Sequence, residues 1–156
     1  AVDLLGAWVG AGVPETDKFA FTDVNGQDCE AVFGRDVLPL FIESNIWYPG
    51  SLSCSSCHQA NLTIALQNMD LSSYAGILAG SMRANGEPKG NDILGGVWED
   101  SLLYQMVYSE NGASLINRPL MPLGRTPDVP DKGPLIFAGR IILVEGTADA
   151  SATPSP

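Results

Sequence analysis

The residues most suggestive of chemistry are the five in the sequence Cys54-Ser55-Ser56-Cys57-His58. Two thiols at this spacing lie on a single turn of backbone, and the next residue places an imidazole beside them. The spacing suits two thioether bonds to the vinyl groups along one porphyrin edge, with the imidazole directed at the iron, and it is typical of c-type haem attachment. The motif therefore predicts one haem c, bound covalently through Cys54 and Cys57, with His58 as an iron ligand.

The motif allows three other interpretations. A structural zinc site usually takes its ligands from two Cys or His pairs, whereas this chain has only Cys29 as a further cysteine and His58 as its sole histidine. A thioredoxin-like pair should open a long helix in a βαβ setting, which the neighbouring sequence does not indicate. A disulfide between Cys54 and Cys57 stays possible, but it leaves the adjacent histidine without a role. Haem attachment is the favoured interpretation.

A second axial ligand cannot be another histidine of the same chain, so the methionine sulfurs are the next candidates. Met69 lies only 11 residues beyond His58, too near to cross easily to the opposite haem face. Met106 falls on the apolar face of a predicted helix, where packing is the ordinary role of methionine. Met82 is plausible, but it is followed by a polar stretch.

Met121 is the methionine best placed by sequence to bind the iron. It lies 63 residues beyond His58, which leaves room for two helices to pass round the haem. Pro119 and Pro122 flank it and stiffen the loop. A rigid loop without helical hydrogen bonds can hold a sulfur at a fixed height. We therefore expect His58 and Met121 to be the two axial ligands, with a packing role for Met121 as the alternative.

Composition limits the class of partner. The chain has 156 residues, 45% of them hydrophobic, and a formal net charge of -10. Such a surface repels nucleic acid, so nucleic-acid binding is not expected. An acidic surface can steer a redox partner with a basic docking surface, or it can simply keep the protein soluble. No apolar run reaches the roughly 18 residues of a transmembrane helix, so no membrane span is expected.

The N-terminal residues and the motif together suggest a compartment. No charged segment followed by an apolar segment opens the sequence, which fits a mature chain whose signal peptide has been removed. Covalent haem attachment takes place after export. We therefore expect a periplasmic or extracellular protein.

The chain divides by pattern into four stretches, residues 1–33, 34–60, 61–145 and 146–156. Asn25-Gly26 between two strand-like runs predicts a β-hairpin, because both residues tolerate positive φ. Residues 1–33 are therefore expected to contain an N-terminal hairpin. Residues 146–156 are rich in Ala, Ser, Thr and Pro and are expected to form a flexible tail.

Two short helices are predicted around the motif from apolar spacing and capping residues. One spans residues 37–42 and can accommodate Pro39 only in its first turn. The other is expected to be capped by Asp70, to span about 72–79 and to end at Gly80.

Two further segments are predicted nearer the C-terminus. A helix should begin near Asp100 or Ser101 and carry one apolar face, made of Leu102, Leu103, Met106 and Val107. Residues 135–144 are apolar enough for either a helix or a strand.

These segments resemble parts of class I (monohaem) cytochrome c domains, most closely the bacterial branch found in respiratory complexes and multidomain dehydrogenases. The similarity lies in residues 33–41 and 70–80, in the helix before the ligand loop at 100–107, and in the pair Met121-Pro122. It covers about residues 33–145 and implies that they form the haem domain, with residues 1–32 as an N-terminal β-hairpin extension. The fold it implies is a mainly α cytochrome c fold, with three to four short helices round one haem that has an exposed edge.

The sequence departs from the family in three places. Residues 1–32 lie outside its pattern, as does an insertion at 46–50 before the first cysteine. The last family helix usually carries an aromatic residue near its end, where this chain has Ile142 and Leu143.

The resemblance implies an electron-transfer protein and not an enzyme, as a free carrier or as a subunit of a larger redox assembly. Residues 1–32 are expected to contact a partner, with Phe19 or Phe21 exposed on one face of the hairpin. Cys29 is expected to be a buried, inert thiol, although it could bridge two chains. The alternatives are a structural or polymer-forming cytochrome that assembles through residues 1–32, and a haem enzyme or sensor with an open sixth site. The lack of a second histidine argues against the last.

Overall fold

The computed structural model describes residues 1–81, 93–95, 97–137 and 140–141. Its elements are short and mainly helical. In chain order they are α1 (Val2–Gly10), β1 (Phe19–Thr22), β2 (Asp28–Ala31), the π-helical turn η1 (Phe33–Val37), α2 (Pro39–Ile42), the 3-10 turns η2 (Cys54–Ser56) and η3 (Leu66–Asn68), α3 (Tyr74–Ala79), the 3-10 turn η4 (Trp98–Asp100), α4 (Leu102–Val107), and the strands β3 (Ser109–Glu110), β4 (Ala113–Ser114), β5 (Ile136–Phe137) and β6 (Arg140–Ile141).

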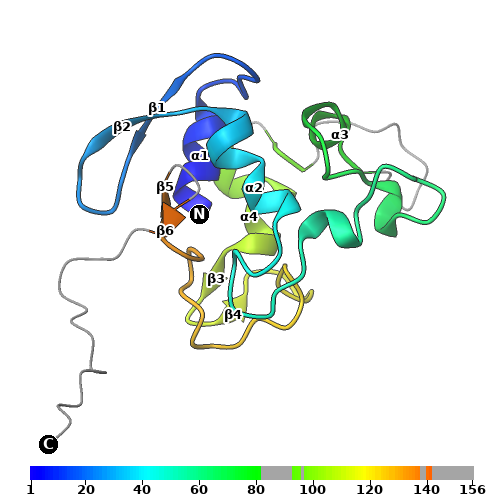
Figure 1. Cartoon of the computed structure of the whole chain (residues 1–156). Coiled ribbons are helices and arrows are strands. Elements are labelled where there is room, and N and C mark those ends of the chain that lie inside the picture. The colour runs from blue at the N-terminus through cyan, green and yellow to red at the C-terminus, as the bar shows by residue number, and fades with distance from the viewer. Residues whose placement is uncertain (82–92, 96, 138–139, 142–156) are drawn as a thin grey trace, which may run out of the picture.

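The helices form the centre and the strands form separate ribbons. Strands β1 and β2, β3 and β4, and β5 and β6 each pair antiparallel in a sheet of two strands. Figure 1 shows α1 and α4 together in the middle, the β1–β2 hairpin extending to one side, and the segment with α3 on the other. Within the described residues, no helix has the length and apolar character needed to cross a membrane.

Helix α1 is a core element that the sequence patterns did not predict. Val2, Leu4, Leu5 and Trp8 are all buried, so the helix turns one broad apolar face to the core. Gly6 lets it lie against η4, because a Cβ at this position would come within 2.7 Å of Trp98 Nε1. The first ten residues are therefore part of the folded body.

The predicted hairpin is present, with a turn that differs in detail. Phe19 pairs with Ala31 and Thr22 with Asp28. Gly26 takes a φ of 76°, whereas Asn25 is not in the left-handed region. Gly26 donates its N–H to Asp23 O at 3.0 Å, as expected for a three-residue loop that ends in a left-handed glycine. Of the two residues in the predicted turn, Asn25 and Gly26, only Gly26 therefore adopts a positive φ.

Residues 1–32 do not behave as the expected extension. Phe19 and Phe21 are buried, so the expectation that one of them is exposed for docking was wrong. Trp8 is fully buried, donates from Nε1 to Pro14 O at 2.9 Å, and packs its ring 5.2 Å from that of Phe33. The hydrophobic core is continuous across the boundary that was predicted between residues 32 and 33.

The predicted helices near the motif are present, with one change of cap. Pro39 occupies the first turn of α2, as its geometry required. Helix α3 is capped by Ser73, whose Oγ accepts from Gly76 N at 3.1 Å, and not by Asp70. Asp70 instead holds the capping segment by accepting from Ser72 N at 2.8 Å. Gly80 ends the helix with a φ of 71°.

Helix α4 begins after Ser101 as predicted, and its cap accepts from Tyr104 N at 3.1 Å. Leu103 and Val107 are buried, but Met106 is partly exposed and lies outside the core, so its predicted packing role was wrong. The ambiguous segment at 135–144 forms β5 and β6 in its described part, not a helix. Residues 142–145 and the predicted tail at 146–156 lie outside the described residues.

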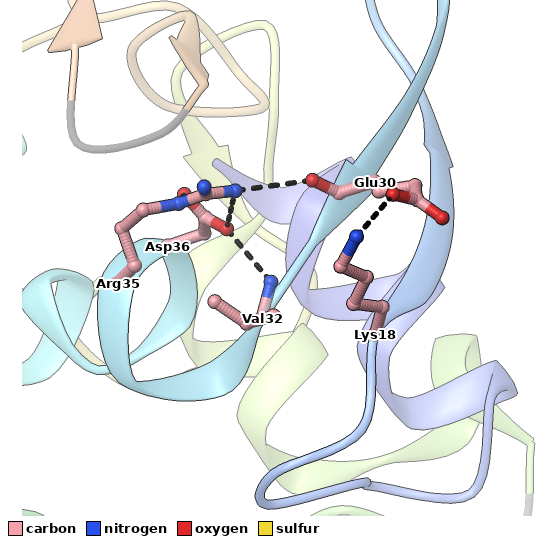
Figure 2. Close-up of polar contacts among 5 residues, drawn as sticks. All are labelled: Lys18, Glu30, Val32, Arg35 and Asp36. Carbon is pink, nitrogen blue, oxygen red and sulfur yellow. Dashed lines mark hydrogen bonds and ion pairs between the residues drawn. The ribbon is translucent and has the colours of Figure 1, made fainter.

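A buried carboxylate joins the hairpin to η1 (Figure 2). The side chain of Asp36 is fully buried and accepts from Val32 N at 2.7 Å. Arg35 donates to both of its oxygens, from Nε at 2.9 Å and from Nη2 at 2.8 Å, while remaining 54% exposed. Arg35 also donates to Glu30 O at 3.1 Å. The hydrogen bonds that this ion pair makes to Val32 N and Glu30 O thus fix η1 to the hairpin.

We expect Arg35→Met to lower the free energy of unfolding by about 3–5 kcal/mol, because it leaves the buried Asp36 carboxylate without its counter-charge. Adding Asp36→Asn to that variant should restore part of the loss. Lys18→Met is the control, since it breaks the exposed Lys18–Glu30 pair and should cost at most about 1 kcal/mol. Urea unfolding of the wild type, the two single variants and the double variant measures these free energies. Equal losses in Arg35→Met and Lys18→Met would contradict it.

Candidate haem-binding site

The structure places the three motif residues on one turn. Cys54 O accepts from Cys57 N at 3.2 Å and from His58 N at 2.9 Å, so the cysteines and the histidine share one face of η2 and the residues after it. Both thiols are free and partly buried. The pair is therefore available for covalent attachment from a single face.

The turn is held against α2. The Sγ of Cys54 donates to Leu40 O at 3.7 Å. Burial raises the pKa of the Cys54 thiol to about 12, so this thiol stays protonated at neutral pH. Before Cys57, Ser53 Oγ lies 2.7 Å from Ser56 Oγ and ties the two ends of the turn together. The position of the first cysteine is thus fixed by packing on the preceding helix.

His58 is buried and its ring is oriented by a backbone carbonyl. Its Nδ1 lies 2.9 Å from Leu66 O, and because a carbonyl oxygen can only accept, Nδ1 carries the proton. In the neutral ring Nε2 is then the nitrogen that keeps its lone pair, as required of an imidazole that binds a metal. Histidine ligands of metals are commonly fixed in this way by their second nitrogen.

Leu66 belongs to the candidate site through this contact, and sequence reasoning missed it. The segment between His58 and Leu66 is closed by two further backbone bonds, from Leu66 N to Cys57 O at 2.9 Å and from Leu71 N to His58 O at 2.9 Å. Leu66 acts through its carbonyl oxygen, which every residue has. No side-chain pattern in the sequence could have identified it.

The methionines differ in placement. Met121 packs partly buried against the same hydrophobic core as Cys54, and its N–H donates to Met106 O at 2.7 Å. Met69 also packs on this core. Met82 lies outside the described residues. The loop that carries Met121 is thus adjacent to Met106, so these two sulfur-bearing residues are neighbours.

The loop that carries Met121 is held at its base by a charged network. Arg125 donates to Val107 O and, at 2.8 Å, to Pro130 O. Asp131 accepts from Ser109 Oγ at 2.6 Å and from Gly112 N at 2.9 Å. The Ser109 bond, with the two backbone N–H bonds after it, lowers the pKa of the Asp131 carboxyl. These hydrogen bonds join residues 107–112, which precede the Met121 loop, to residues 125–131, which follow it.

Exposed apolar side chains are frequent in the two segments that carry the predicted ligands, residues 52–66 around the cysteine motif and residues 115–123 around Met121. The described residues include eight exposed large hydrophobic side chains, and five of them lie in these parts: Leu52, Ile64, Leu66, Leu115 and Leu123. A haem is a flat, largely apolar body that would cover such side chains. The donor set of two thiols and one imidazole on a single turn fits a haem c.

Cys29 is separate from this site. It lies in β2, partly exposed and free, so the expectation that it is buried was wrong. Partial burial and the neighbouring Asp23 and Asp28 carboxylates raise the pKa of its thiol. The thiolate form is disfavoured, which agrees with a low reactivity.

Comparison with known proteins found no matching family model, no matching curated protein and no matching solved structure. What this chain binds is therefore inferred from its own residues. The relevant ones are the paired thiols of Cys54 and Cys57 and the oriented His58 ring.

Proposed function

We propose that this protein transfers electrons through one haem c, attached covalently to Cys54 and Cys57, with His58 and Met121 as axial ligands. The observation that carries the proposal is the bond between His58 Nδ1 and Leu66 O, which leaves Nε2 as a lone-pair donor beside the two thiols. The resemblance to class I cytochrome c domains agrees with this assignment.

Each part of the site has a distinct role in this proposal. The bound iron supplies a one-electron couple. Leu66 fixes the His58 ring, and a thioether from Met121 raises the reduction potential relative to a second nitrogen ligand. Exposed apolar side chains such as Leu52, Ile64 and Leu123 would shield the group from water wherever it covers them, which would also tune the potential. Because His58 and Met121 would both hold the iron, it would offer no site to a substrate.

The proposal extends to compartment and partner. Haem c attachment follows export, so we place the protein in the periplasm or outside the cell. A net charge of -10 favours redox partners with a basic docking surface. The rate of electron transfer to such a partner should fall as salt rises, because screening weakens the attraction between the two surfaces.

A stoichiometric reductive titration followed by optical spectroscopy tests this function. We expect each chain to take up one electron reversibly, and the ferric protein to show the weak long-wavelength band of a thioether ligand. A ferric protein without that band that also turns over peroxide would instead support the enzyme alternative. Polymers seen by size-exclusion chromatography without reductant would support the structural alternative.

A further inference from the structure

The insertion at residues 46–50, which departs from the family pattern, forms a compact turn just before the motif. Asn45 N donates to Ser51 O at 2.8 Å, and Ser51 N donates to Tyr48 O at 3.0 Å. Gly50 N donates to Asn45 Oδ1 at 2.8 Å. Ser51 itself is buried. The turn is closed by its own bonds and cannot move independently of the residues that follow it.

This turn and the first cysteine are attached to the same atom of α2. Trp47 is buried and donates from Nε1 to Leu40 O at 2.9 Å. The Cys54 thiol donates to the same carbonyl oxygen. The backbone at Trp47 and Tyr48 is therefore held in a fixed position relative to Cys54.

Tyr48 extends from the turn to the loop of Met121. Its hydroxyl donates to Leu123 O, 75 residues further along the chain and two residues past Met121. Gly124 has a φ of +88°, and a Cβ there would lie 3.0 Å from the Tyr48 hydroxyl oxygen. The tyrosine ring end thus lies directly against the backbone at 123–124.

The Met121 loop is consequently held on both sides of the sulfur-bearing residue. On one side Met121 N donates to Met106 O at 2.7 Å, which ties it to the end of α4. On the other side Leu123 O accepts from Tyr48. The second tie is the one that runs directly to the segment of the cysteine motif.

We propose that Tyr48 is a positioning residue for Met121. It fixes the loop to the segment that holds Cys54, so the Met121 sulfur keeps a constant position relative to the motif. The inference rests on the proposed function, in which Met121 is an axial ligand. It also assigns a role to the insertion at 46–50.

The test compares wild-type holoprotein with Tyr48→Phe and with Tyr74→Phe. Tyr74 is a matched control, because its hydroxyl donates to a distant backbone carbonyl, Val13 O, at 2.7 Å, away from the loop. One measurement is the rate at which cyanide binds the ferric protein, because cyanide should bind only after the Met121 sulfur has dissociated from the iron. The other is hydrogen–deuterium exchange in the peptide that spans residues 118–125.

Tyr48→Phe should speed both cyanide binding and exchange at 118–125 by about 2- to 10-fold, the factor expected for one lost hydrogen bond. Tyr74→Phe should leave both at the wild-type values. Wild-type rates in Tyr48→Phe, or equal acceleration in both variants, would overturn the proposal. If the wild-type protein lacks the thioether band, the ligand assignment of Met121 fails instead. Exchange at 118–125 then still decides whether Tyr48 holds the loop.

Discussion

Replacing Met121 with alanine is expected to abolish the weak long-wavelength charge-transfer band of the ferric protein, because that band needs a thioether on the iron. The reduction potential should fall, since Met/His ligation raises it. The iron should also become open to cyanide and, when reduced, to carbon monoxide. Absorption spectra and a potentiometric titration of wild-type and variant protein measure these changes.

The other described methionines serve as controls for this result. Met69→Ala and Met106→Ala should keep the band, and Met106→Ala should cost at most about 2 kcal/mol of stability, because this side chain is only partly buried. Loss of the band in Met106→Ala would identify Met106 as the ligand, a near alternative given that its carbonyl accepts from Met121 N. If the wild-type protein has no band, the sixth site is open or filled from another chain.

Deleting residues 1–32 is expected to unfold the protein. The deletion removes α1 and the hairpin, and with them the fully buried Trp8 and the buried Phe19 and Phe21. Trp8→Ala alone should lower the free energy of unfolding by about 3–5 kcal/mol. That is a large share of the roughly 5–15 kcal/mol that holds a domain of this kind together.

Asp3→Asn is the matched control in the same helix. Asp3 pairs with Lys132 at 3.0 Å with both side chains exposed, so its loss should change stability by at most about 1 kcal/mol. Circular dichroism and urea unfolding of Trp8→Ala, Asp3→Asn and the truncated chain measure the effect. A truncated chain that is as stable as the full chain would contradict this prediction. It would instead support residues 1–32 as an accessory docking segment.

Local signals in the sequence predicted the elements that depend on them. Gly26 indicated the hairpin, and Ser101 indicated the start of α4. Helix α1 was missed because Gly6 and Gly10 lower helix propensity and its apolar residues do not form one narrow stripe. Gly6 is needed for contact with Trp98, a residue distant in sequence, and such contacts carry no local signal.

The candidate site likewise has residues that the sequence predicts and residues that only the folded chain brings into it. The cysteines and His58 could be found from spacing alone, because their chemistry depends on side-chain type. The carbonyl of Leu66 and the contact between Tyr48 and Leu123 could not, because backbone oxygens are the same at every position. Their roles arise only from how the chain folds.

Covalent attachment is tested most directly by extracting denatured protein with acidified organic solvent and weighing the intact chain by mass spectrometry. The protein should be produced with export and cytochrome c maturation. We expect wild-type and Cys29→Ser chains to keep their colour and the added mass of one haem, and a Cys54→Ser/Cys57→Ser chain to have neither. A colourless wild-type chain with the mass of its sequence alone would contradict the assignment of a haem c to this motif.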